Sequence, residues 1–205
     1  MSTVLVCTGA TVTFKSLIDQ ILSVSFVQNL INTGVTKLIV QYGNEIKGNK
    51  HISQLFFEST IKKNQLVEHL NLEICTCNDN KQCITFTSSN FKIECFPFSP
   101  QIDQYIAQAD VVISHAGTGS IIDVLHQHKK LIVVVNQSLM DNHQEEIANE
   151  FVKNGYCLCA KCRDLCSDEF VKSLKLLLKE EAKLKQLKES DGRTLESIIC
   201  EELTG

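Results

Sequence analysis

Several features are missing from this 205-residue sequence, and each absence excludes a class of function. Positive charge is not in excess: the formal net charge of -4 argues against a nucleic-acid-binding surface. No apolar run is as long as a membrane span. The first apolar segment has no basic region before it, so we expect no secretory signal and a soluble, cytosolic chain.

Proline is also scarce, and the chain contains no linker, internal repeat or low-complexity segment. The only two prolines, Pro97 and Pro100, bracket Phe98 and Ser99, which predicts an extended connection there. The length suits one buried domain, or one domain with a tail. We therefore expect a domain over residues 1–165, followed by C-terminal helices over residues 166–205 that pack on it and could also contact a partner.

Cysteine, by contrast, is abundant, with ten residues in the chain. Without a secretory signal these are expected to be reduced thiols rather than disulfides. The densest group is Cys157, Cys159, Cys162 and Cys166. Structural zinc usually needs two close pairs separated by a longer loop, and this group lacks that separation. We therefore predict small buried or half-buried thiols and no metal site.

Strand-like and helix-like apolar patterns alternate along most of the chain. Short apolar runs at residues 3–7, 37–41, 111–113 and 131–135 are typical of buried strands, and helical spacing follows each of them. This order predicts an α/β fold with a doubly wound, mostly parallel, Rossmann-like sheet. Residues 83–87 and 91–95 flank a Ser-Ser-Asn turn and predict a hairpin.

The segment over residues 111–123 is the most informative. A β-branched run leads through Gly117, Thr118, Gly119 and Ser120 into a helix, which aims backbone N–H groups at an anion. Thr118 and Ser120 could cap that helix or donate to phosphate oxygens, and Asp123 could accept from a ribose hydroxyl. An ordinary strand-to-helix turn gives the same pattern, so the segment alone leaves both interpretations open.

Four polar or glycine-bearing loops should meet near this segment. Ligands of open α/β sheets bind beyond the carboxyl ends of the strands, at a topological switch point. The loops expected there span residues 8–11, 96–99, 114–120 and 137–144. Their convergence predicts a nucleotide site.

Residues 7–11 (Cys-Thr-Gly-Ala-Thr), 111–123 and 136–144 resemble a known family, the catalytic subunits of the eukaryotic UDP-N-acetylglucosamine transferase. That enzyme adds the second sugar of the dolichol-linked oligosaccharide, and the resemblance covers residues 3–160. The wider, glycosyltransferase family 28-like group has the GT-B fold, whose C-terminal half binds the sugar nucleotide. The resemblance implies that this chain is the equivalent donor half. A membrane-anchored partner would bind the lipid-linked acceptor and hold the chain at the cytosolic face of the endoplasmic reticulum.

The resemblance also implies which residues contact the donor. The positions that match the loop facing the diphosphate and acceptor are Gly9, Ala10 and Thr11, and those whose backbone would bind uracil are Phe98 and Ser99. The positions that match the diphosphate-binding turn are Gly117, Thr118, Gly119 and Ser120. Those that would hold the N-acetylglucosamine are His143 and Gln144. Asp123 matches a ribose-binding glutamate that is one methylene longer. His143 could instead be a helix-entry residue, with Asp141 as a plain N-cap.

The implied reaction is attack by a GlcNAc 4-hydroxyl on the anomeric carbon of UDP-GlcNAc, with inversion and loss of UDP. A helix N-terminus would stabilise the leaving diphosphate, and no Asp-x-Asp motif of metal-dependent transferases occurs in the chain. His115 is the candidate general base. It could instead hold the shape of the loop through a hydrogen bond, and the base could lie on the partner chain. The alternative functions are a non-catalytic subunit that binds the nucleotide sugar and a UDP-sugar epimerase-like enzyme.

Overall fold

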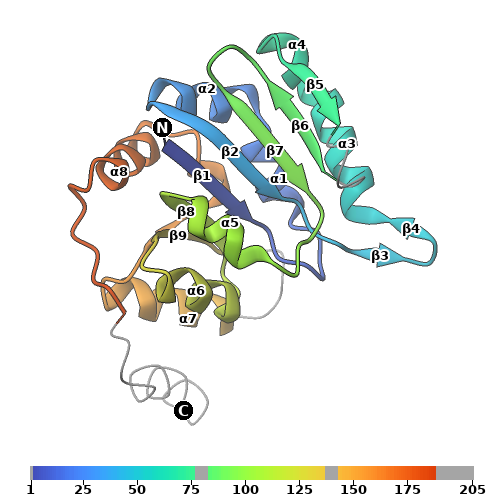
Figure 1. The fold of residues 1–205 in the computed structure, drawn as a ribbon. Helices are drawn as coiled ribbons and strands as arrows, with labels where there is room; N and C mark the ends of the chain where they lie inside the picture. The colour runs from blue at the N-terminus through green and yellow to red at the C-terminus, as the bar shows by residue number, and fades with distance from the viewer. Residues whose placement is uncertain (1, 77–82, 137–142, 188–205) are drawn as a thin grey trace.

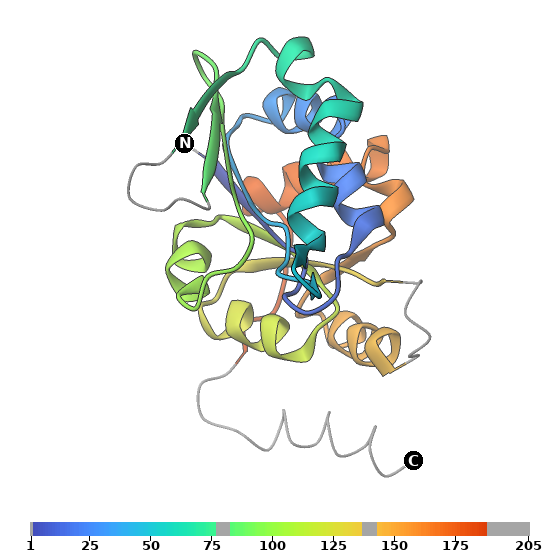
Figure 2. The ribbon, with the colours of Figure 1, turned by 90° about the vertical axis from the view of Figure 1, so that its right-hand side faces the viewer.

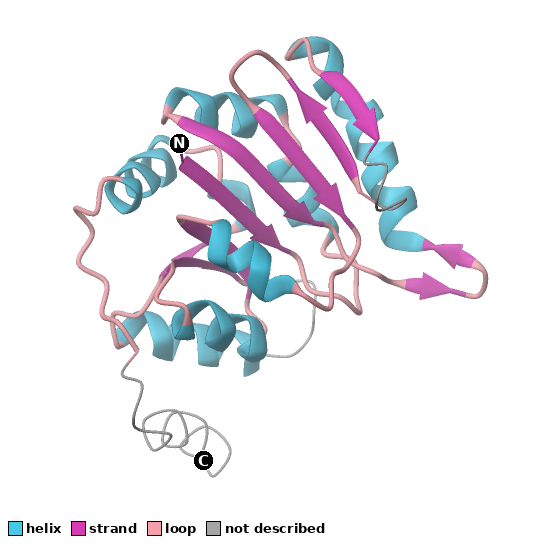
Figure 3. Ribbon diagram, in the orientation of Figure 1, coloured by secondary structure: helices cyan, strands magenta, loops and turns pink. Residues whose placement is uncertain are grey.

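The structure, a computed structural model, describes residues 2–76, 83–136 and 143–187. Its centre is an eight-stranded sheet of order β10-β9-β8-β1-β2-β7-β6-β5 (Figures 1 and 3). The parallel strands are β1 (Ser2–Cys7), β2 (Val35–Gln41), β7 (Lys92–Phe96), β8 (Val111–His115), β9 (Lys130–Val134) and β10 (Leu158–Ala160). At one edge β6 (Ile84–Thr87) pairs antiparallel with β7, which confirms the predicted hairpin. The edge strand β5 (Glu73–Thr76) in turn pairs antiparallel with β6.

Helices cover both faces of the sheet, because the central strands bury alternate residues on opposite sides. Val4 and Val6 join one apolar cluster, and Leu5 and Cys7 join the other. The first cluster is closed by α1 (Lys15–Ile21), α2 (Val24–Asn32), α3 (Ile52–Asn64), α4 (Leu66–His69) and α8 (Asp168–Leu178). The second is closed by α5 (Ile102–Gln108), α6 (Thr118–His126) and α7 (His143–Lys153). This arrangement confirms the predicted doubly wound, mostly parallel fold.

The switch point of the sheet lies between β1 and β8. From β1 the sheet adds β2 and β7 on one side, and from β8 it adds β9 and β10 on the other. The connection after β1 enters α1 on one face, whereas the connection after β8 enters α6 on the opposite face. Cys7 and Ser114 are partners in the two neighbouring strands, so both loops begin side by side. Such a point is where open α/β sheets bind ligands.

Three local features differ from the simple pattern. The first helical region is divided at Ser23, whose hydroxyl caps α2 by accepting from the Phe26 N–H. The second is divided at Gln65, whose left-handed φ of 47° separates α3 from α4. A short hairpin of β3 (Ile46–Lys47) and β4 (Lys50–His51), which was not predicted, projects from the body before α3 (Figures 1 and 3).

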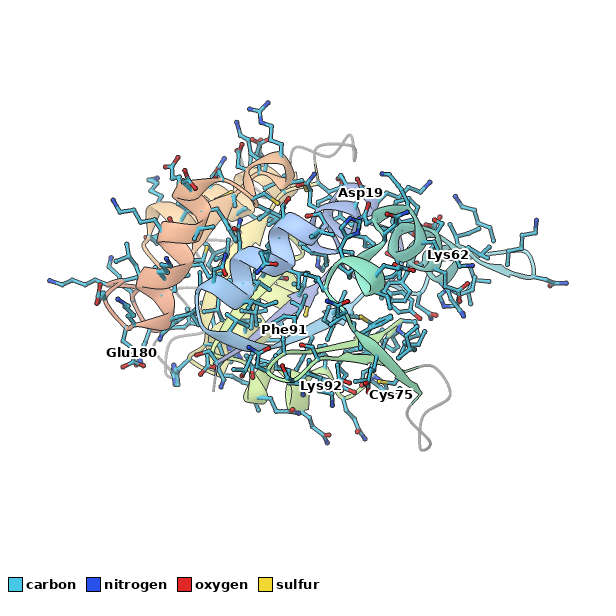
Figure 4. The ribbon with its side chains drawn as sticks, turned by 90° about the horizontal axis from the view of Figure 1, so that it is seen from above. Asp19, Lys62, Cys75, Phe91, Lys92 and Glu180 are labelled. Carbon is cyan, nitrogen blue, oxygen red and sulfur yellow. The ribbon has the colours of Figure 1, made fainter. Side chains whose placement is uncertain are left out.

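The helices of the first face form one layer. Seen from above, α1 and α2 lie between α8 on one side and α3 on the other (Figure 4). Lys63 of α3 pairs with Asp19 of α1 at 2.9 Å, which fastens the outer helix to the layer. The carboxyl ends of the strands, where the loops of interest begin, lie at one edge of this layer (Figure 2).

The C-terminal part of the described chain crosses from one face to the other. Phe170 and Leu174 of α8 pack in the first cluster, and Leu187 packs in the second. Lys130 at the start of β9 pairs with Glu180 at 3.4 Å along this route. Residues 188–205 of the predicted tail lie outside the described residues. No helix in the described ranges is long and apolar enough to cross a membrane.

Candidate functional site

The loop after β1 is built around Gly9. Its φ of +84° is a left-handed conformation that glycine adopts without strain, which explains this residue type here. Thr8, just before it, donates from Oγ1 to the Gln41 carbonyl at 2.9 Å and from its N–H to the same oxygen at 3.2 Å. Thr8 therefore extends the β1–β2 pairing to the point where the loop turns away.

Backbone hydrogen bonds join this loop to two others. The Asn44 N–H donates to the Ala10 carbonyl at 2.8 Å, and the Gly43 N–H donates to the Pro97 carbonyl at 2.9 Å. The loops after β1, β2 and β7 are thus connected at the carboxyl edge of the sheet. This geometry brings together two of the four predicted loops, residues 8–11 and 96–99, with residues 43 and 44 as the link.

A buried polar cluster, Thr13–Glu45–Ser53, supports the same loops from outside. Thr13 Oγ1 lies 2.8 Å from Ser53 Oγ, the Glu45 N–H donates to Ser53 Oγ at 2.9 Å, and the Thr13 N–H donates to Glu45 Oε2 at 2.9 Å. The Lys47 ammonium, 2.8 Å from Glu45, together with these Thr13 bonds, lowers the pKa of the Glu45 carboxyl to about 2. Glu45 is therefore ionised at neutral pH and fixes the end of the loop.

His115 ends β8 and lies between two glycines. Its Nε2 is 3.0 Å from the place where a Cβ on residue 9 would stand, and closer still to the place of a Cβ on Gly117. Its Nδ1 is buried and makes no hydrogen bond within the described residues. Burial lowers the pKa of the imidazole, with the Cys7 backbone opposing that effect. A neutral imidazole at physiological pH follows.

The N-terminus of α6 begins beside this histidine. Gly117 is the N-cap, and no side chain caps the helix there. The first intrahelical bond runs from the Ile121 N–H to the Gly117 carbonyl, so the N–H groups of Thr118, Gly119 and Ser120 belong to the open end of the helix. The predicted capping by Thr118 or Ser120 is thus not used. Their hydroxyls and the positive end of the helix remain available to an anion.

A cavity of about 200 Å³ opens between the two loops. Its lining combines predicted residues with others: Thr8, Gly9, Ala10, Thr11, Val12, Phe14, His115 and Asn136. Asn136, only 7% exposed, begins the 136–144 motif that resembles the family, but it was not a predicted site residue. Its position as the first polar residue after the buried β9 strand could have identified it. A larger cavity of about 510 Å³, between β10 and α8, contains none of the predicted site residues.

The remaining predicted residues are not among those that line this cavity in the described part of the chain. Phe98 is exposed and follows the Pro97 carbonyl that binds Gly43. Asp123 is on α6, one turn from its start, where partial burial and the nearby Asp103 carboxylate raise its pKa. His143 and Gln144 are the first residues of α7, and Asp141 lies outside the described residues. Ser99 lies one residue beyond Phe98 and donates no loop bond; its hydroxyl accepts from the Gln101 N–H.

The cysteines of the C-terminal group are separate thiols in the described structure. Cys157 is buried, Cys159 is exposed, and Cys162 and Cys166 lie against the first helical region. Cys162 Sγ is 3.6 Å from Ser16 Oγ, and Cys166 Sγ is 3.6 Å from Ser23 Oγ. Among the described residues, no three His, Cys, Asp or Glu side chains gather closely enough to hold a metal ion. Of the four, Cys162 helps to pack η1 (Cys162–Asp164) onto α1 through Ser16.

A doubly wound sheet with a helix N-terminus and a glycine loop at its switch point is an architecture that open α/β domains use to bind nucleotides. The chain matches the glycosyltransferase family 28 C-terminal domain over residues 49–199, and it belongs to that family. It is 44% identical to the UDP-N-acetylglucosamine transferase subunit ALG13 of Candida albicans, over 99% of this chain and 74% of the relative. It is 41% identical to the subunit of the same name from Debaryomyces hansenii, over 99% of both chains.

Solved structures agree with this assignment. The NMR structure of ALG13 has a TM-score of 0.65 and 31% identity, covering 96% of this chain and 94% of that chain. Acinetobacter baumannii MurG has a TM-score of 0.55 and 16% identity, covering 88% of this chain and 43% of that chain, which is a likeness of fold alone. These matches confirm the resemblance to a UDP-N-acetylglucosamine transferase subunit that the sequence motifs indicated.

Proposed function

We propose that this chain is the donor-binding, catalytic subunit of a two-chain, inverting N-acetylglucosaminyltransferase. It would transfer GlcNAc from UDP-GlcNAc to GlcNAc-diphospho-dolichol in a β-1,4 linkage, the second step of lipid-linked oligosaccharide synthesis. The observation that carries the proposal is the junction of the Gly9 loop, His115 and the α6 N-terminus at the switch point. The names of the relatives support the sugar nucleotide and the status of a subunit.

In this reaction the site must stabilise the negative charge of the leaving UDP diphosphate. As the bond from the anomeric carbon to UDP breaks, negative charge grows on the β-phosphate oxygen. The open N–H groups of Thr118, Gly119 and Ser120 and the dipole of α6 are already oriented, so they need no rearrangement to receive that charge. Ribose hydroxyls would bind Asp123, and uracil would bind the backbone at Phe98 and Ser99.

The acceptor hydroxyl must lose a proton as it attacks. His115 is neutral near pH 7 and thus in the protonation state that a general base needs. Its Nε2 faces the Gly9 loop, the side from which the acceptor would approach. A base supplied by a membrane-anchored acceptor-binding partner would serve equally. That partner would also hold this chain at the cytosolic face of the endoplasmic reticulum.

The test is transfer of labelled GlcNAc from UDP-GlcNAc to a GlcNAc-diphospho-lipid acceptor. The full chain is assayed alone and with membranes that carry the acceptor-binding partner, and donor binding is measured separately by calorimetry. Transfer that requires both components supports the proposal. Donor binding by this chain, together with equal transfer by the partner membranes in its absence, would make it a non-catalytic binding subunit. Release of an epimerised UDP-sugar without any acceptor would identify an epimerase-like enzyme.

A further inference from the structure

Exposed apolar side chains gather at the same edge of the sheet as the candidate site. Among the described residues six large apolar side chains are exposed, and four belong to segments at the carboxyl edge. Those four are Val12, Ile46, Leu55 and Phe98. Val12 and Phe98 belong to the site loops, whereas Ile46 and Leu55 lie outside the site. We call Ile46, Lys47, Lys50 and Leu55 the hairpin tip.

The hairpin tip is held away from the body of the protein. Ile46 is 60% exposed on β3, and its partner across the hairpin is His51. Leu55, 53% exposed, is on the first turn of α3, which contacts β3. In Figures 1 and 4 the hairpin projects beyond the helices and the sheet. More than half of each side chain is thus exposed, Ile46 on the protruding hairpin and Leu55 on the helix that follows it.

This protrusion is braced. The Ile52 N–H donates to the Glu45 carbonyl at 2.8 Å, and Glu45 belongs to the Thr13–Glu45–Ser53 cluster. At the other strand, His51 accepts from the Gln54 N–H at 3.0 Å as the N-cap of α3. A hairpin fixed at both strands keeps its apolar residues exposed instead of letting them fold back onto the surface. Because the hairpin is already ordered, its residues would lose little conformational entropy on binding.

The charges around these apolar side chains are basic, in a chain whose formal net charge is -4. Lys47 and Lys50 flank the turn, and both side chains are exposed. The one carboxylate of the hairpin, Glu45, points inward to the Thr13 N–H as well as pairing with Lys47. Lys15, at the start of α1, lies over the ring of Phe56 of α3 at 5.7 Å. Glu45 offsets the charge of Lys47, and Glu58 lies one turn beyond Leu55 on α3, so the excess positive charge at the turn is that of Lys50.

We propose that the hairpin tip docks this chain on an anionic phospholipid surface. Ile46 and Leu55 would enter the boundary between headgroups and acyl chains, and Lys47 and Lys50 would contact the lipid phosphates. Apolar residues that protrude singly with lysines beside them suit a bilayer better than the flat, closely packed surface of a protein partner. The proposal rests on the proposed function in one respect: docking there would turn the site toward a membrane-held acceptor.

The test is co-sedimentation of the full chain with vesicles. Phosphatidylcholine vesicles are compared with vesicles of phosphatidylcholine and phosphatidylserine, at low and at high salt. We expect binding to the anionic vesicles, and weaker binding to the neutral ones or in high salt. Ile46→Asp with Leu55→Asp should lower the partition coefficient by about tenfold or more, since two apolar contacts are lost. Lys47→Gln with Lys50→Gln should lower it by about tenfold.

Matched variants elsewhere separate docking from a general loss of charge or apolar surface. Ile74→Asp with Leu176→Asp changes the two exposed apolar residues outside the carboxyl edge, and Lys172→Gln with Lys175→Gln removes two exposed lysines of α8. Both controls should bind vesicles like the wild type. Circular dichroism checks that every variant is folded.

Three results would overturn the proposal: no binding of the wild type to anionic vesicles, unchanged binding of the hairpin variants, or equal losses in the controls. Hairpin variants that lose transfer activity with partner membranes, while the wild type binds no vesicles, would make the tip a protein contact instead. UDP-GlcNAc binding, followed by calorimetry, should not change in the variant with Ile46→Asp and Leu55→Asp. If the wild type did not bind UDP-GlcNAc, that result would count against the proposed function but not against vesicle docking.

Discussion

The Nε2 atom of His115 lies against Gly117, at a place where a side chain on residue 117 would stand. The same imidazole faces Gly9, so two glycines from different loops make room for one histidine. For Gly9 the positive φ also favours glycine, whereas Gly117, with a φ of -81°, needs glycine for space alone. The loops after β1 and β8 are therefore spaced by this ring.

Gly117→Ala should destabilise the protein, because its Cβ would displace the His115 ring. We expect a loss of about 1–3 kcal/mol of unfolding free energy, the usual cost of overpacking. The matched control for folding is Gly119→Ala, whose Cβ meets no described atom within 4 Å. That variant should keep its stability or gain up to about 1 kcal/mol. Urea denaturation measures both.

The cause can be isolated with a double-mutant cycle. If the clash with His115 explains the loss, Gly117→Ala should cost less in a His115→Ala background than in the wild type. Strictly additive effects of the two substitutions would show that the ring is not what residue 117 must avoid.

Stability should fall as His115 is forced to accept a proton. The folded pKa is lower than the ordinary value of 6.5, so below pH 6.5 the unfolded chain binds protons that the folded chain does not. This contribution is fully present above pH 6.5 and is lost as the pH falls toward the folded pKa. His115→Gln should flatten that part of the curve of unfolding free energy against pH. His128→Asn, a change at an exposed histidine, should leave it unaltered.

His115→Ala should reduce transfer strongly while UDP binding stays within a few fold of the wild type. The reason is that a base acts on the acceptor proton and not on the nucleotide. Turnover is measured with the lipid acceptor, and UDP affinity by calorimetry. Parallel losses of turnover and of UDP binding would instead assign His115 to holding the loops in place.

Ser53→Ala should loosen the support of the Gly9 loop. The variant removes the buried hydroxyl that meets Thr13 Oγ1 and accepts from the Glu45 N–H, which should cost about 1–3 kcal/mol of stability. Ser59→Ala, on the same helix, loses only an exposed bond to the Phe56 carbonyl and should change stability by about 0.5 kcal/mol or less. Thermal unfolding compares the two, and similar shifts would mean that the cluster contributes little.

Asp123→Asn should weaken UDP-GlcNAc binding by about tenfold, the usual value of a charged hydrogen bond to a ligand. Asp123→Glu should bind as well as the wild type or better, since the longer side chain reaches the ribose more easily. Asp103→Asn should lower the pKa of Asp123, because the Asp103 carboxylate helps to raise it. Calorimetry at several pH values measures these effects. Unchanged binding by Asp123→Asn would remove this residue from the site.

The sequence predicts the strands and both glycine loops because their signals are local. Apolar runs such as residues 131–135 end at polar residues, and Gly9 follows a buried strand directly. The hairpin at residues 46–51 carries a turn signal, Gly48-Asn49, but its two-residue strands have no apolar alternation, since their only apolar residue is the exposed Ile46. The helix break at Gln65 is also hidden, because a left-handed glutamine is not marked by glycine or proline.

Contacts between distant segments are equally unpredictable from local patterns. The fit of His115 between Gly9 and Gly117 depends on how two strands align, and the sheet order itself comes from packing. The ionised Glu45 has the same origin: Thr13 and Ser53, which hold it, come from two other segments. Individual residue types indicated the site, whereas its supports appear only in three dimensions.

The bonds that join the loops after β1, β2 and β7 run between backbone groups: Asn44 to Ala10, and Gly43 to Pro97. A peptide group offers the same donor and acceptor whichever side chain it carries. Residues 10, 44 and 97 can therefore change identity without breaking these links, provided that the spacing along the chain is kept. Insertions and deletions in these turns should be far more damaging than substitutions. The lengths of these loops are therefore more strongly constrained than the residue types in them.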